Sequence, residues 1–192
     1  MRYASKSVIT SILLLFFTST CLAGDYTFRN TKWGMSMAEV KASEPLTVAK
    51  EEENLVAYRT SIIGKDVFVV YLFTDNQLTR AKYVLAESHS NKNDFITDYN
   101  DFKEILKKKY GNPSKDEVLW RNDLYKDDYS DWGTAISLGH LLYFSTWETK
   151  DTEIASILTG ENFDVTCAIE YSSKRLEELE KKAKEKKAID AF

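Results

Sequence analysis

Short polar turns between apolar runs are the feature that most limits how this chain can fold. Three apolar runs, at residues 55–63, 67–73 and 78–87, are separated only by the turns at residues 64–66 and 74–77. Loops this short join adjacent antiparallel strands, whereas parallel strands need a crossover of a dozen or more residues. The pattern therefore predicts antiparallel hairpins and an α+β fold rather than βαβ units.

The second half of the chain has further apolar segments, and polar turn residues again separate them. A glycine-containing turn at residues 160–162 separates the last two of them. The earlier run at residues 67–73 has no polar side chain on either face, which predicts a central strand covered on both sides. We expect the strands of the second half at residues 117–121, 134–147, 153–159 and 163–171.

Two helices are predicted in the body of the chain. Ser36 and Glu39 form a capping box for a short helix that ends before Pro45, and Met35 is placed to pack on Val40. A longer helix is predicted at residues 94–110, because apolar side chains recur there every three or four positions. Its core-facing stripe contains Phe95, Tyr99, Phe102, Ile105, Leu106 and Tyr110.

The order of these elements predicts an α+β domain at residues 24–172, with one or more antiparallel sheets and two packed helices. Residues 24–90 match a helix followed by three strands, and residues 91–172 a longer helix followed by three or four strands. We therefore expect a diverged tandem repeat. Residues 173–192 carry Glu–Lys pairs four residues apart, which predicts a solvated C-terminal helix that docks weakly.

Residues 1–23 have the composition of a secretory signal peptide. Arg2 and Lys6 precede an apolar stretch of about ten residues, which is too short for a membrane-spanning helix. We expect cleavage after Ala23 and a periplasmic or secreted protein without a transmembrane segment. The alternative is a lipoprotein anchored through Cys21, although the threonines before this residue fit the lipidation pattern poorly.

Charge excludes one class of partner. The chain has 26 basic and 30 acidic side chains, and loss of Arg2 and Lys6 with the leader shifts its formal net charge from −4 to −6. Nonspecific nucleic-acid affinity comes from lysine and arginine side chains that neutralise phosphates, and only the C-terminal segment has a basic excess. We therefore expect no nucleic-acid partner.

Cleavage after Ala23 would leave Cys167 as the single cysteine and would forbid an intrachain disulfide. The strand that contains Cys167 is expected to place a row of apolar side chains on one face, comprising Phe163, Val165, Cys167, Ile169 and Tyr171. The thiol is interpreted as buried and inert, and a reactive or intermolecular thiol is the alternative.

The sequence has no nucleophile elbow, P-loop or dinucleotide-binding fingerprint. Its two histidines, His89 and His140, have no partner at metal-binding spacing, which argues against a zinc site and for structural roles. We therefore expect no cofactor and no catalytic residues.

One segment, residues 116–133, combines six acidic with four aromatic side chains. Such a segment could stack on a sugar, hold an irregular calcium ion or anchor a protein partner, although its spacing does not match an EF-hand loop. The alternative is a solvated loop whose aromatic rings pack on the sheet. The candidate contact residues are Trp120, Tyr125, Asp127, Tyr129, Asp131 and Trp132.

The motif FRNxxWGMSxxEV at residues 28–40 resembles the opening of a broad group of uncharacterised exported bacterial proteins. Similar members continue with a Tyr-Gly-x-Pro helix stop, here at residues 110–113, a strand with Trp147, and a late Tyr171-Ser172 pair. More distantly, the helix opening is similar to that of small outer-membrane assembly lipoproteins and of β-lactamase-inhibitor-like repeat proteins. These resemblances imply tandem helix-plus-sheet units that bind other proteins.

Together these observations predict an exported, non-enzymatic module of the bacterial cell envelope. It would bind an envelope protein or another envelope component through its sheet face or through residues 116–133. The alternative is a glycan-binding or metal-ion-binding module centred on residues 116–133. A carboxylate-based hydrolase is a third interpretation, and it would need two carboxylates that converge in one cleft.

Overall fold

The computed structural model describes residues 27–191, so the expected leader and Cys21 lie outside the described residues. Eight strands form one antiparallel sheet in the order β1-β2-β3-β4-β8-β7-β6-β5, which confirms the predicted α+β class. The strands are β1 (Val48–Glu52), β2 (Leu55–Ile62), β3 (Lys65–Thr74), β4 (Gln77–Leu85), β5 (Lys115–Trp120), β6 (Leu141–Glu148), β7 (Thr152–Glu161) and β8 (Asp164–Ser173). The helices are α1 (Met37–Ser43), α2 (Asp94–Tyr110), α3 (Trp132–Ser137) and α4 (Glu177–Asp190), with a short 3-10 helix, η1 (Tyr129–Asp131).

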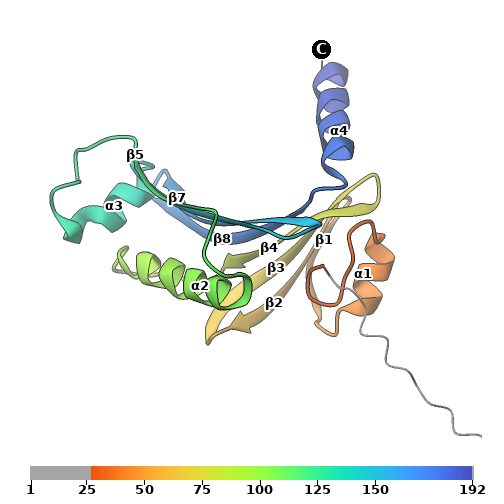
Figure 1. Cartoon of the computed structure of the whole chain (residues 1–192), viewed down its shortest axis with the longest axis horizontal. Coiled ribbons are helices and arrows are strands. Elements are labelled where there is room, and N and C mark those ends of the chain that lie inside the picture. Colours follow the sequence, from red (N-terminus) through yellow and green to blue (C-terminus); the bar gives the residue numbers. More distant parts are fainter. Residues whose placement is uncertain (1–26, 192) are drawn as a thin grey trace, which may run out of the picture.

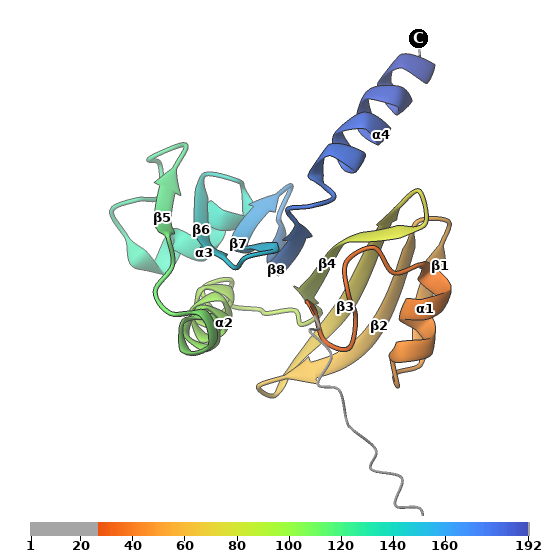
Figure 2. The same cartoon turned by 45° about the vertical axis from the view of Figure 1, so that its right-hand side comes forward.

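The sheet consists of two meanders that meet at its centre, where β4 pairs with β8 (Figure 2). The first meander follows α1, and the second follows α2 with α3 inserted between β5 and β6. Each half is therefore a helix followed by four strands. The expectation of three strands in the first half is wrong, because β1 adds a strand. All side chains of β1 are exposed, so it has none of the apolar alternation that identifies a strand in a sequence.

Both longer helices of the body lie on one side of the sheet (Figure 1). On α2, the predicted stripe is buried at Phe95, Tyr99, Phe102 and Leu106, and the Tyr99 hydroxyl is hydrogen-bonded to that of Ser145 on β6 (2.6 Å). The stripe is narrower than expected, because Ile105 is 38% exposed and Tyr110 is only partly buried.

The N-terminal motif FRNxxWGMSxxEV acts through packing and capping. Ser36 and Glu39 form the predicted capping box of α1. Phe28 packs against Tyr171 with 4.9 Å between ring centroids, and the Trp33 indole donates to the Thr152 hydroxyl (2.8 Å). These residues therefore hold the segment before β1 onto the sheet.

Two sequence expectations around the second meander are wrong. The segment expected as a strand at residues 134–147 begins with α3, and only Leu141–Glu148 is extended. Ala135 and Ile136 are buried side chains of α3. Gly139 then adopts a positive φ of 75° before β6 starts. Phe163 was expected to face inward but is 63% exposed, because its φ of 70° places it in the β7–β8 turn.

The expectation that β3 is covered on both faces is wrong. Its side chains alternate between fully buried positions, such as Val69 and Tyr71, and half-buried positions, such as Phe68 and Val70. The buried side chains lie in the core beneath α1 and α2. The half-buried side chains point to the opposite side, which α1 and α2 do not cover and which α4 contacts near Arg80; we call this side the helix-free face. The 67–73 run is thus internal to the sheet but has one open face.

The C-terminal helix is shorter than the predicted 173–192 segment, because β8 continues to Ser173. In Figure 1, α4 projects from the end of β8 on the side of the sheet opposite α1 and α2. Leu176 and Glu180 at its start are buried, whereas nearly all of the later described side chains are exposed, which agrees with weak docking. Among the described residues, no helix combines the length and the apolar character needed to cross a bilayer.

Candidate functional site

A continuous apolar row crosses the helix-free face. Strand register places Phe68 opposite Val84, Val84 opposite Ala168, Ala168 opposite Ile157, and Ile157 opposite Phe144. All five side chains are partly buried, and together they span β3, β4, β8, β7 and β6. An antiparallel sheet with a solvated face ordinarily carries polar side chains there, so this row, which we call the apolar row, is a candidate contact surface.

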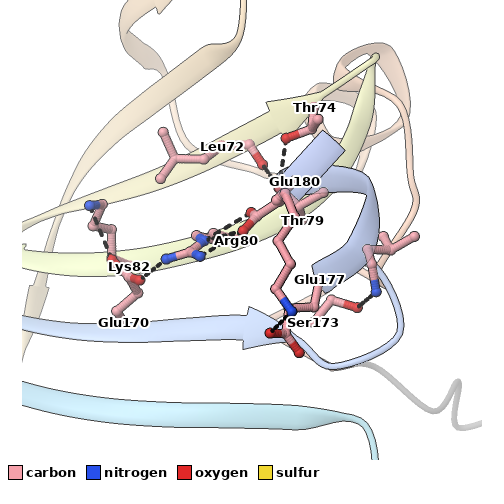
Figure 3. A network of polar contacts seen from close by, with 11 residues as sticks. Leu72, Thr74, Thr79, Arg80, Lys82, Glu170, Ser173, Glu177 and Glu180 are labelled. Atoms are coloured by element: carbon pink, nitrogen blue, oxygen red, sulfur yellow. Dashed lines mark hydrogen bonds and ion pairs between the residues drawn. The ribbon is translucent and has the colours of Figure 1, made fainter. Parts of the chain in front are cut away.

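Next to the apolar row, four charged side chains form a network near the N-terminal end of α4 (Figure 3). The Arg80 guanidinium contacts the Glu180 carboxylate of α4 (2.6 Å) and the Glu170 carboxylate of β8 (2.6 Å). Lys82 also contacts Glu170 (3.2 Å). Arg80 therefore joins α4 to two strands at the centre of the sheet.

The electrostatics of this network favour the ionised form of Glu180. Burial would raise the pKa of Glu180, but hydrogen bonds from Arg80 and Thr79 outweigh it and hold that pKa below its ordinary value. The same hydrogen bond raises the pKa of Arg80 above its ordinary value. Arg80 and Glu180 thus form a charged pair at neutral pH.

A groove of about 660 Å³ lies over this network. Its floor includes Leu72, Arg80 and Glu170, and α4 forms one wall with Ala183 and Lys184. Although Glu170 and Glu180 both face the groove, both are bound to Arg80. A glycosidase acid needs a carboxyl whose pKa is raised, so this geometry does not suit the carboxylate-hydrolase interpretation.

In the predicted segment 116–133, the aromatic rings mainly contact one another and the neighbouring chain. Trp120 lies edge-to-face against Trp132 (5.5 Å between centroids), Tyr129 lies beside Trp132 (5.1 Å), and Tyr125 stacks on His140 (5.9 Å). Only Tyr129 of these four rings is largely exposed. The rings line neither the groove at α4 nor a second cavity at the β7–β8 turn, so the packed-loop interpretation describes them best.

The acidic residues of the same segment do not converge on one point. Asp128 accepts hydrogen bonds from Ser130, and Asp123 pairs with Lys126. Asp127 is exposed and Asp131 is half-buried, and among the described residues no three potential metal ligands from this segment gather within 4.8 Å. The structure therefore brings together Trp120, Tyr129 and Trp132 but not the acidic candidates.

One titratable cluster was not anticipated from sequence. Glu87, His89 and Asp98 place potential ligand atoms within 4.8 Å of one another. The buried Asp98 carboxylate already contacts both the Lys65 ammonium (2.6 Å) and His89 Nε2 (2.5 Å), so positive charge is supplied from within the chain. This favours a structural role for His89, as expected. The nine-residue spacing of His89 and Asp98 across a loop gave no recognisable motif.

Cys167 is buried, as predicted, and burial raises the pKa of its thiol to about 12. A protonated thiol in the core is a poor nucleophile, which fits the inert interpretation.

Comparison with known proteins adds no family to these observations. No family model, no curated protein and no solved structure matches the chain.

Proposed function

We propose that this chain is an exported, non-enzymatic module of the bacterial cell envelope that binds another protein on its helix-free face. The apolar row is the observation that carries this proposal. Five half-buried apolar side chains in register across five strands would be costly to keep in water, and contiguous apolar patches rimmed by polar groups mark protein interfaces.

The surroundings of the row support a protein partner over a small ligand. The row extends across most of the sheet, whereas small ligands are bound in concave pockets that enclose them. The Arg80 network and the groove at α4 lie beside the middle strands of the row, β4 and β8, and would form part of a polar rim. We therefore propose a partner with a complementary apolar surface of its own. Export, expected from residues 1–23, places that partner in the envelope.

Site-specific photocrosslinking in the producing bacterium tests the proposal. Phe144, in the apolar row, and Phe163, exposed in the β7–β8 turn, would each be replaced by the photoreactive analogue p-benzoylphenylalanine. The Phe144 position should give one discrete crosslinked protein, and the Phe163 position should not. Addition of Ala168→Arg at the centre of the row should abolish the crosslink without changing the melting temperature by more than a few degrees.

Three results with the variants above would contradict the proposal, and a fourth concerns the identity of the crosslinked protein. They are the absence of a discrete crosslink from Phe144, an equal crosslink from Phe163, and a Phe144 crosslink that survives Ala168→Arg. A Phe144 crosslink that joins only two copies of the chain would also contradict it, because it would show self-association instead of capture of another protein.

A further inference from the structure

The two edges of the sheet differ in how they are protected against pairing with another strand. β1 is short, its pairing with β2 is interrupted by a register shift between Val48 and Lys50, and three of its five residues are charged. These are the features that keep sheet edges from associating. β5 instead pairs with β6 without interruption, and its Val118 and Leu119 are 47% and 42% exposed. Figure 2 shows β5 at the outer edge of the second meander.

The hydrogen-bonding pattern leaves donors and acceptors on the open side of β5. The Arg121 N–H donates to the His140 carbonyl of the segment that leads into β6 (2.7 Å). In an antiparallel pair, alternate residues direct their backbone groups to the same neighbour. Leu119 and Glu117 therefore bond toward β6, whereas Trp120, Val118 and Asp116 direct their N–H and C=O groups outward.

The side chains of this edge are complementary to themselves in one register. When two copies pair antiparallel about a twofold axis at Leu119, each Glu117 lies opposite Arg121 of the other copy, and each Val118 lies opposite Trp120. The sequence thus places opposite charges together on one face and apolar side chains together on the other. Cross-strand pairs of both kinds stabilise antiparallel sheets.

Neighbouring registers lack this complementarity. An axis at Val118 places Glu117 opposite Leu119 and Lys115 opposite Arg121, which brings two positive charges together. An axis at Glu117 places two glutamates directly opposite each other. Registers that differ from the Leu119-centred one by an odd number of residues are excluded. They would put the helix-covered faces of the two copies on opposite sides of the joined sheet, whereas a twofold axis perpendicular to the sheet keeps both on the same side.

From these observations we propose that two copies of this chain associate through β5, with a twofold axis at Leu119, to form one continuous sheet. Trp120, one of the aromatic residues singled out in the sequence, then contacts Val118 of the second copy. Trp132 of the same copy lies edge-to-face against the Trp120 ring. The proposal does not depend on the helix-free face, which stays open in the dimer.

A charge-swap cycle tests this register. The chain, purified as the producing cell processes it, would be studied by sedimentation equilibrium over a range of concentrations. Glu117→Arg and Arg121→Glu each place like charges opposite each other at two symmetric positions, so each should weaken dimerisation by about tenfold or more. The double variant restores opposite charges and should recover dimerisation. Glu53→Arg, the same change in an exposed turn far from β5, should have no effect.

A backbone variant keeps the test independent of charge. Val118→Pro removes an outward N–H without removing a hydrogen bond to β6, and it should abolish the dimer. Circular dichroism would verify that each variant retains its fold. The proposal is overturned if the unaltered chain is monomeric at all concentrations. It is also overturned if the dimer persists in the single swaps, or if the double swap fails to restore association in a folded protein.

Discussion

Replacement of Leu106 by alanine tests whether the α2 stripe forms the core of the second half. Leu106 is 3% exposed. The substitution removes three carbon groups, each worth roughly 0.8 kcal/mol on transfer from water to the core, or about 2.4 kcal/mol together. The cavity left behind adds to this, so the free energy of unfolding should fall by about 3–4 kcal/mol. For a domain of this size, the melting temperature should fall by roughly 6–16 °C.

The adjacent Ile105→Ala variant is a matched control on the same helix. Ile105 is 38% exposed, and alanine has the higher helix propensity, so we expect a loss of about 1 kcal/mol or less. Urea unfolding followed by far-UV circular dichroism would give both free energies. Equal losses for the two variants, or an unchanged melting temperature for Leu106→Ala, would refute the assignment of this face to the core.

Three further predictions concern buried groups. Asp98→Asn should lower the free energy of unfolding, measured by urea denaturation, by about 2–3 kcal/mol, because it weakens charged hydrogen bonds in the core. The control Asp101→Asn should lower it by less than about 1 kcal/mol, because Asp101 is exposed. With Cys21 replaced by serine, a thiol reagent should label Cys167 only after denaturation, and rapid labelling of the native protein would contradict its burial. Because folding lowers the pKa of Glu180, its contribution to α4 docking is full above the ordinary value of 4.5 and is lost as the pH falls through the lower folded value. Backbone ¹⁵N order parameters of α4 should therefore decrease between about pH 6 and pH 3, and constant values would exclude this coupling.

Local patterns predicted those parts of the fold that are determined by neighbours along the chain. α2 and the capping box at Ser36 appear where expected. The two hairpin turns are shorter than the predicted 64–66 and 74–77, because the strands leave only residues 63–64 and 75–76 between them. β1 was not recognisable, since all its side chains are exposed, and α3 was taken for strand because a short apolar segment fits either structure.

The candidate site depends on register and on contacts between distant residues, which no local pattern contains. The alternation of side chains along a strand assigns Phe68 and Ile157 each to one face of its own strand. It does not show that the two side chains lie on the same face of the sheet, or that pairing of β4 with β8 aligns them in one row. Likewise, Arg80 and Glu180 are separated by 100 residues, so their pairing follows only from the return of β8 to the centre of the sheet.

The topology itself explains why one face of the sheet is uncovered. Each half is a helix followed by a four-stranded meander, and the halves join through antiparallel β4 and β8. A twofold rotation that exchanges β4 with β8 has its axis perpendicular to the sheet, because these two neighbouring strands are antiparallel. Such a rotation keeps each face of the sheet on its own side. The helices that begin the two halves, α1 and α2, therefore lie on the same face, and neither of them covers the opposite face. The helix that follows β4 is α2, whereas β8 is followed by α4, which contacts that opposite face near Arg80. The apolar row thus lies on the face that this arrangement leaves uncovered by α1 and α2, which is the face on which we propose that a partner binds.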